Sequence, residues 1–364
     1  MTINALKTSL IIFISTSFFS CTGQVKPEDH KVETKRAIGK VVNELDNQIW
    51  KIFQDSKGKY WFGSNGRGIY CLDGKQMKLF TTADNLIDNT IRGIQEDRFG
   101  NIYIETPEGI SQFDGTKFTT LKVVQSPDNE WKLNPNDLWF GCNANDVYRF
   151  DGASLHELKL PRKDLKAAFG VETEGVPFKG NNNSPYAVFG VNKDKDGHIW
   201  FGTATAGAFR FDGKTILWLG EKELSTLPDG RVPGVRAIIQ DNEGCFWASN
   251  FLSKYKIDPK QPKGYEKMKA VYLSQVSKND KLLYFNAGIA DDKGNLWMTT
   301  YGNGVWKYDG KTLSKFEVFN GKENVLLVSI FQDKNGILWL GTDNDGVYKS
   351  NGESFEKFEI NQQD

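Results

Sequence analysis

One pattern of apolar and polar positions recurs along the chain as a module of about 45 residues. Each copy reads as an apolar strand, Asp-x-x-Gly, a strand with an aromatic residue, a polar loop ending in glycine, an apolar strand, Asp-Gly and a strand with Phe. Both turn sequences favour tight hairpins, so each copy is predicted to form four antiparallel strands. Aligned on the aromatic residue of the second strand, the copies number seven: Trp61, Tyr103, Trp139, Trp200, Trp247, Trp297 and Trp339.

The second strand of each copy is apolar on consecutive positions, as in Ile199-Trp200-Phe201, so both of its faces must be buried. A lone four-stranded sheet cannot bury two faces, whereas sheets stacked radially between identical neighbours can. The pattern therefore predicts an all-β protein, a seven-bladed β-propeller of four-stranded antiparallel blades over residues 47–364. The first strand of several copies carries a small residue, as expected where innermost strands crowd an axis: Gly93, Gly190, Ala237, Ala287 and Ser329.

Three parts of the chain depart from this pattern. The third copy replaces the first turn with Asn134-Pro135-Asn136-Asp137, and the fifth replaces the second turn with Ile257-Asp258-Pro259. The last copy supplies its own fourth strand, which leaves 37–45 without an assigned place and the closure of the ring open.

The N-terminal segment predicts export. Residues 1–20 carry one charge, Lys7, and an apolar stretch too short for a stable membrane span, as in a secretory signal peptide. Cys21 directly follows Ser20, which resembles a bacterial lipoprotein signal in which Cys21 becomes the lipidated first residue. Plain secretion with cleavage near Ser20 is the alternative. Residues 21–46 are polar and are predicted to form a tether, so we expect an anchor in the cell envelope, on the periplasmic side of the outer membrane or at the cell surface.

The amino-acid composition argues against several classes of function. The 46 basic and 46 acidic residues leave no net charge, which argues against nucleic-acid binding. Three histidines provide little material for a metal centre, and no cofactor is predicted. Cys71, Cys142 and Cys245 are widely spaced and are interpreted as small strand residues. The 36 glycines and 13% aromatic residues fall mostly into the repeated turn and strand positions.

The repeated module resembles the two-component regulator propeller repeat, over about residues 47–360. That family's repeats build seven-bladed propellers in the extracytoplasmic sensor regions of hybrid histidine kinases, often linked to glycan sensing. The resemblance therefore implies a binding surface and a sensory role. The sequence shows no kinase or DNA-binding domain, so a signal is expected to pass through a partner.

Two motifs resemble loops that bind phosphate or calcium, but each is better explained as a turn of a blade. The stretch from Gly63 to Gly68 looks like a phosphate-binding loop, but its equivalents recur in other copies, so we interpret it as a blade turn. Asp194-Lys195-Asp196-Gly197 looks like the start of a calcium loop, but Thr205 stands where the twelfth-position Glu belongs. No metal site is predicted.

Ligand binding is predicted on one face of the propeller. Long insertions between a fourth strand and the next first strand open on that face, and long loops commonly carry function: Lys159–Pro185, Gly220–Pro233 and Pro259–Lys281. Short loops and the entrances of the innermost strands add amide, guanidinium and aromatic groups suited to a sugar or a protein edge. The candidate ligand-binding residues are Trp50, Arg67, Arg92, Asn143, Phe189, Thr205, Arg236, Asn250, Asn286, Tyr301, Asn303 and Asp343.

Three functions follow from these observations. The first is a lipid-anchored ligand-binding or sensory module that binds a small molecule or glycan. The second is a scaffold for an envelope protein complex. The third is an enzyme like streptogramin lyase; the scarcity of His argues against it, and no catalytic residue is nominated. In each case the membrane is contacted through the lipid alone.

Overall fold

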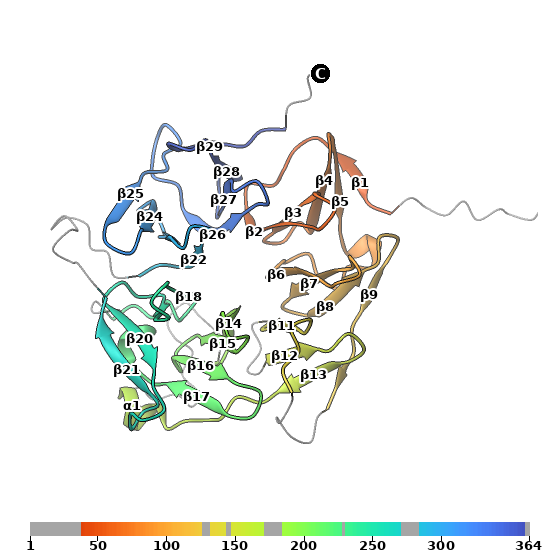
Figure 1. Ribbon diagram of the computed structural model, residues 1–364. Coiled ribbons are helices and arrows are strands. Elements are labelled where there is room, and N and C mark those ends of the chain that lie inside the picture. The colour runs from red at the N-terminus through yellow and green to blue at the C-terminus, as the bar shows by residue number, and fades with distance from the viewer. Residues whose placement is uncertain are drawn as a thin grey trace, which may run out of the picture. The chain divides into compact units, whose positions relative to one another are not determined.

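A computed structural model of the protein describes residues 38–125, 132–142, 147–170, 184–227, 230–270 and 284–360. These residues form seven sheets arranged as blades around one axis, which confirms the predicted seven-bladed β-propeller (Figure 1). Within these ranges, helices are confined to α1 (Leu165–Phe169) and the single turns η1 (Thr82–Asp84) and η2 (Lys222–Leu224). None of the helices in this part of the chain has the length and apolar character needed to cross a membrane.

Six blades follow the predicted order of strands from the axis outwards. In blade one these are β2 (Ile49–Gln54), β3 (Tyr60–Ser64), β4 (Ile69–Asp73) and β5 (Gln76–Phe80); in blade two, β6 (Gly93–Glu96), β7 (Ile102–Thr106), β8 (Gly109–Phe113) and β9 (Phe118–Thr120). In blade four they are β14 (Val188–Lys193), β15 (Ile199–Thr203), β16 (Ala208–Phe211) and β17 (Ile216–Leu219); in blade five, β18 (Ile238–Gln240), β19 (Phe246–Ala248), β20 (Ser253–Ile257) and β21 (Tyr265–Lys269). In blade six they are β22 (Ala287–Ala290), β23 (Leu296–Thr299), β24 (Val305–Tyr308) and β25 (Leu313–Phe316); in blade seven, β26 (Leu327–Gln332), β27 (Leu338–Thr342), β28 (Val347–Ser350) and β29 (Phe355–Lys357).

Blade three differs from the others. Its sheet contains β11 (Leu138–Phe140), β12 (Val147–Phe150) and β13 (Leu155–Leu158), with β10 (Val123–Val124) at the outer edge. β10 pairs parallel with β13, whereas the sequence predicts antiparallel strands only. The position of its innermost strand falls on residues 126–131, outside the described residues.

Blade one gains a fifth strand that sequence analysis does not assign. β1 (Lys40–Val42) pairs antiparallel with β5 at the outer edge of the blade. These residues lie within the stretch predicted as tether, so the sheet begins before residue 47. The rest of the predicted tether up to residue 37, including Cys21, lies outside the described residues.

The insertion predicted in blade five is shorter than expected. Its range, Pro259–Lys281, contains β21, the fourth strand of that blade. Because the usual Asp-Gly turn is replaced by Asp258-Pro259, the sequence hides the hairpin that joins β20 to β21.

The recurring Asp and Trp of each module form one structural unit. In five blades Oδ2 of the Asp accepts a hydrogen bond from the indole Nε1 of the Trp six residues later, at 2.8–3.1 Å: Asp55–Trp61, Asp194–Trp200, Asp241–Trp247, Asp291–Trp297 and Asp333–Trp339. In blade two the Tyr103 hydroxyl donates to Asp97 instead, at 3.0 Å. The other carboxylate oxygen accepts backbone N–H groups of the turn, as from Lys57 and Lys59 to Asp55. Each Asp therefore ties the first hairpin to the strand that packs between blades.

The hydrophobic core is divided among the blade interfaces. The buried apolar side chains form seven clusters, and each cluster joins two neighbouring blades. Trp200 of blade four, for example, lies 4.2 Å from Phe246 of blade five between ring centroids. Each blade is thus stabilised by its two neighbours, as the consecutive apolar positions of the second strand predict.

The glycine two residues after the Trp permits this close packing. A Cβ atom at Gly202 would lie 2.2 Å from the backbone oxygen of Val235, which belongs to the connection into blade five. At Gly341 it would lie 2.4 Å from the backbone oxygen of Ile49 in blade one. The Trp-x-Gly motif therefore marks where the next blade approaches the second strand.

The ring closes without an exchanged strand, because blade seven holds four strands of its own. The Lys334 backbone N–H donates to Gln54 Oε1 of blade one at 3.0 Å. The Lys195 N–H makes the equivalent bond to Gln240 of blade five, also at 3.0 Å. The closing interface is thus of the same kind as an internal one, and β1 adds only Val42, which packs against its hydrophobic cluster.

Candidate functional site

One ring of side chains at the inner strands surrounds the axis. It is formed by the residue eleven positions before the aromatic residue of each second strand. The described members are Trp50, Arg92, Phe189, Arg236, Asn286 and Val328, and each lines a cavity at the axis. The sequence predicts five of the six as strand entrances, and it misses Val328.

Backbone irregularities direct three of these side chains. The pairing registers of β2, β14 and β26 with their neighbours shift at Trp50, Phe189 and Val328, respectively. A β-bulge of this kind bends a strand and re-aims the extra residue. The three bulges occur at the same position of the module, where the innermost strand enters the blade.

Two arginines of this ring stack on aromatic residues of the preceding blade. The Arg92 guanidinium carbon lies 4.5 Å from the ring centroid of Trp50, and that of Arg236 lies 4.7 Å from the centroid of Phe189. Arg92 also donates to Asn65 Oδ1 at 3.0 Å, and Arg236 Nε donates to the Pro233 carbonyl at 3.0 Å. These contacts fix the planes of both guanidinium groups at the axis.

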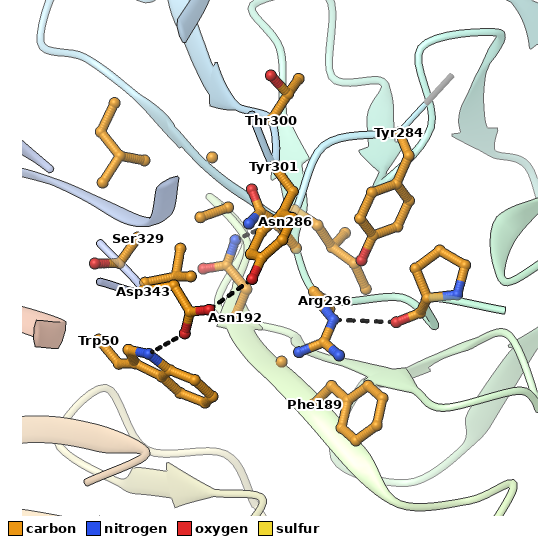
Figure 2. Close-up of a pocket in the computed structure, with 18 of the residues that line it drawn as sticks. Trp50, Phe189, Asn192, Arg236, Tyr284, Asn286, Thr300, Tyr301, Ser329 and Asp343 are labelled. Atoms are coloured by element: carbon orange, nitrogen blue, oxygen red, sulfur yellow. Dashed lines mark hydrogen bonds between the residues drawn. The ribbon is translucent and has the colours of Figure 1, made fainter. Parts of the chain in front are cut away.

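A carboxylate connects blades one, six and seven at the mouth of the cavity. Asp343 accepts from Trp50 Nε1 at 3.0 Å and from the Tyr301 hydroxyl at 2.6 Å (Figure 2). Burial and the hydrogen bond to Asp343 raise the pKa of Tyr301 to about 12, so the hydroxyl stays a donor at neutral pH. Asp343 therefore orients two aromatic side chains of the lining.

The cavity enclosed by these residues has a volume of about 1270 Å³. A second cavity of about 440 Å³ shares residues with it, among them Phe189, Asn192 and Arg236, and extends along the axis past Arg92 and Glu105. The Gly220–Pro233 insertion contributes Leu227 and 230–233 to the larger cavity. The second predicted insertion thus lies at the site.

Two buried hydroxyl groups in the cavity wall have no partner with hydrogen-bonding geometry among the described residues. They belong to Tyr284 and Ser329. Figure 2 shows the Tyr284 hydroxyl pointing towards the cavity beside Arg236. Burial raises the pKa of Tyr284, so this group is also a neutral donor. Buried polar groups are rarely left unpaired, which makes both hydroxyls candidates for contact with a ligand or water.

Lys51 and Glu105 are two charged residues of the site that sequence analysis misses. Lys51 occupies the position at which other innermost strands carry Gly, Ala or Ser, and this exception is the signal that could have found it. Burial lowers the pKa of Lys51, with Arg92 and Arg236 adding to the shift and Glu105 opposing it. Burial raises the pKa of Glu105, against the effect of hydrogen bonds from the Cys142 and Gly141 backbone.

Two acidic clusters outside the cavities have the composition of metal ligands: Asp194, Asp196 and His198, and Asp241, Glu243 and Cys245. In both, the first Asp is the turn residue that bonds to its Trp. Asp194 also pairs with Arg210 at 3.3 Å, and Asp241 with Lys254 at 3.2 Å. The turn and its cation therefore account for these carboxylates.

Two segments of the chain match a known protein family. Residues 43–66 and 321–344 match the family described as two component regulator propeller. The chain carries regulator propeller repeats. The two matches span the first hairpins of blades one and seven, which meet at the closing interface. No curated protein sequence matches the chain significantly.

Solved structures share the fold of this regulator propeller. The extracellular domain of the hybrid two component system BT4673 from B. thetaiotaomicron is 21% identical with a TM-score of 0.55, over 86% of this chain and 39% of that one. That of BT3049 from B. thetaiotaomicron is 18% identical with a TM-score of 0.59, over 85% and 40%. The chain thus spans about two fifths of these proteins. A streptogramin B lyase is 16% identical with a TM-score of 0.58, over 85% and 96%.

The regulator propeller brings together only part of the predicted site. Seven candidates line the larger cavity: Trp50, Phe189, Arg236, Asn286, Tyr301, Asn303 and Asp343. Arg92 lines the smaller one. Asn286 is engaged between blades, since its amide donates to the Leu327 carbonyl and accepts from Thr299.

The other candidates lie elsewhere. Thr205 and Asn250 are buried away from both cavities, and the Asn250 amide bonds to the Glu223 carbonyl at 2.7 Å. Arg67 is exposed beside Asp46 and lines neither cavity. Asn143 lies outside the described residues. Short loops that look alike in sequence therefore differ in whether they point to the axis or into a blade interface.

Proposed function

We propose that this protein is a ligand-binding sensory propeller whose axial cavity takes a polar ligand, and that the ligand is a glycan. The observation that carries the proposal is the ring at the axis, where Trp50 and Phe189 each hold an arginine in place. The regulator propeller repeats support the sensory role. Transmission of the signal to a separate partner belongs to the same proposal.

The chemistry of the lining suits a sugar. Aromatic faces stack on the apolar faces of sugar rings, while a few fixed polar groups set the orientation. Trp50, Phe189 and Tyr301 provide such faces, and the Tyr284 and Ser329 hydroxyls provide unsatisfied polar groups. The volume of about 1270 Å³ exceeds the range of about 300–1,000 Å³ usual for small-molecule pockets, which favours an oligosaccharide.

The histidines favour binding over catalysis. His156 bonds to Asp151 at 3.2 Å, and His198 contacts Arg210 at 2.7 Å. His156 lies in β13 and His198 directly follows the first turn of blade four, and neither of these described histidines lines the axial cavities. The likeness to streptogramin B lyase is a likeness of fold.

Replacing Arg236 with alanine tests the proposal. We expect affinity for a glycan identified by thermal-shift screening to fall by about tenfold or more, because hydrogen bonds to charged groups contribute roughly 1.5–3 kcal/mol. The melting temperature should change little, since Arg236 makes its one side-chain hydrogen bond within the described residues to a loop carbonyl. Titration calorimetry measures the affinity.

Arg67→Ala is the matched control, because Arg67 is an exposed arginine that lines neither cavity. Its affinity should equal that of the unmodified protein. Equal losses in both variants, or a large drop in the melting temperature of Arg236→Ala, would contradict the assignment of the cavity as the binding site.

We further propose that Cys21 is lipidated and anchors the propeller to the cell envelope. The apolar stretch before Ser20 and the polar segment after Cys21 support this assignment. Cys21→Ala should move the protein from the membrane fraction to the soluble fraction on cell fractionation. Cys71→Ala, which removes a buried thiol of β4, is the control and should stay with the membrane. An unchanged distribution of Cys21→Ala would refute the anchor.

A further inference from the structure

Three cations converge at the axis from different blades. Lys51 lies in β2, Arg92 precedes β6, and Arg236 precedes β18. All three line the smaller cavity. After the larger effect of burial, Arg236 lowers the pKa of both Lys51 and Arg92, while Glu105 raises the pKa of both and Asp88 raises that of Arg92. Like charges repel one another more strongly where burial reduces screening by water, as it does for Lys51 and Arg92, whereas Arg236 is exposed.

No carboxylate of the described residues forms an ion pair with any of the three. The Glu105 carboxylate is occupied by the backbone N–H groups of Gly141 and Cys142, at 3.1 and 2.6 Å. Asp343 accepts from Trp50 and Tyr301. Asp137, in the wall of the smaller cavity, pairs with Arg149 at 2.8 Å.

The Lys51 ammonium group is the least compensated of the three. It forms no hydrogen bond within the described part of the chain, although Lys51 lines both cavities. Arg92 donates to Asn65 and Arg236 to the Pro233 carbonyl, and each stacks on an aromatic ring. The remaining guanidinium N–H groups have the fork geometry that matches a carboxylate or sulfate.

We propose that the axial cavity recognises an anionic sugar, whose carboxylate or sulfate group is held among Lys51, Arg92 and Arg236. This inference rests on the proposed glycan-binding function and adds the charge of the ligand to it. An anion at this place would offset part of the positive charge of the three converging cations, whereas a neutral sugar would leave their repulsion in place. The aromatic rings under the arginines would then contact the sugar adjoining the charged group.

The experiment compares three forms of one oligosaccharide, which differ in the charged group that they carry. The probes are a tetragalacturonate, its carboxyl-reduced neutral form, and that neutral form after sulfation, each titrated calorimetrically into the full chain. A charged form should bind about tenfold or more tightly than the neutral one, because charge-assisted hydrogen bonds are the stronger ones. The affinity of the charged form should fall as NaCl is raised. The two charged probes tell a carboxylate site from a sulfate site.

The Lys51→Met variant tests whether the preference for a charged ligand arises in the axial cavity. The variant should lose about tenfold in affinity for the charged probe and keep its affinity for the neutral one. Its melting temperature should rise, because a partly buried ammonium group without an ion-pair partner among the described residues is replaced by an apolar side chain of similar length. Lys256→Met, which removes an exposed lysine of β20, should change neither quantity.

The outcomes separate this inference from the proposed function. Equal affinities for the charged and neutral probes, or binding confined to neutral glycans, would overturn the anionic site and leave the glycan-binding proposal standing. A fall in the melting temperature of Lys51→Met, with unchanged affinity for the charged probe, would give Lys51 a structural role and also overturn the inference. Absence of binding by every glycan of the screen would refute the proposed function itself.

Discussion

Replacing Asp241 with alanine is expected to destabilise the propeller by about 3–5 kcal/mol, the usual cost of removing one partner of a buried ion pair. Asp241 Oδ2 accepts from the Trp247 indole at 3.0 Å and from Lys254 Nζ at 3.2 Å. The Lys254 side chain is only 4% exposed, so it would remain buried with the exposed Glu243 as its counter-ion. The turn N–H groups of Glu243 and Cys245 would also lose their acceptor.

Urea denaturation followed by tryptophan fluorescence measures this loss. The double variant Asp241→Ala/Lys254→Met should recover part of it, because the buried cation is then removed as well. Asp309→Ala is the control, since Asp309 caps a surface turn through the N–H groups of Lys311 and Thr312 and contacts no indole. A loss in the control as large as that of Asp241→Ala would mean that turn capping alone explains the effect.

Replacing Trp339 with alanine should cost about 3–5 kcal/mol as well, as for other buried tryptophans, and should weaken the closure of the ring. Trp339 of blade seven is 4% exposed and packs against Tyr60 of blade one with ring centroids 4.9 Å apart. Its indole also donates to Asp333 at 2.8 Å. Because no exchanged strand joins blades one and seven, the cavity left by the indole would lie in the interface that closes the ring.

Hydrogen exchange locates this weakening. Amide exchange in Trp339→Ala should accelerate first in β2 and β26, which face each other across the closing interface. Trp200→Ala is the comparison, because Trp200 occupies the same position between blades four and five. It should lose similar stability, with faster exchange in β15 and β18. Identical exchange maps for the two variants would show that the blades open together rather than interface by interface.

The fold could be predicted from the sequence because each module contains the turn sequences that form its own hairpins. Asp-x-x-Gly, Trp-x-Gly and Asp-Gly act locally, and their repetition reveals the consecutive apolar positions that only radial stacking can bury. Prediction fails where the local signal is absent. β1 has no turn that joins it to the sheet, and β21 follows Asp258-Pro259 instead of Asp-Gly.

The candidate site was predicted only in part, and the reason is geometric. Position in the module identified Trp50, Arg92, Phe189 and Arg236, because equivalent positions in a ring share one distance from the axis. The short loops gave a mixed result. Tyr301 lines the cavity, whereas Asn250 turns away from it and its amide donates to the backbone carbonyl of Glu223 in η2. A loop sequence does not specify which of the two directions its side chains take.

The sequence by itself determines that seven four-stranded blades surround an axis, because hairpin turns and buried strand faces are local properties that repeat. It does not determine what meets at that axis. Lys51, Arg92 and Arg236 are far apart in the chain, and only ring closure brings their charges together. The stacking of each arginine on the preceding blade's aromatic residue likewise depends on how adjacent blades are rotated. Tertiary structure alone converts a repeated scaffold into a cavity with a defined charge.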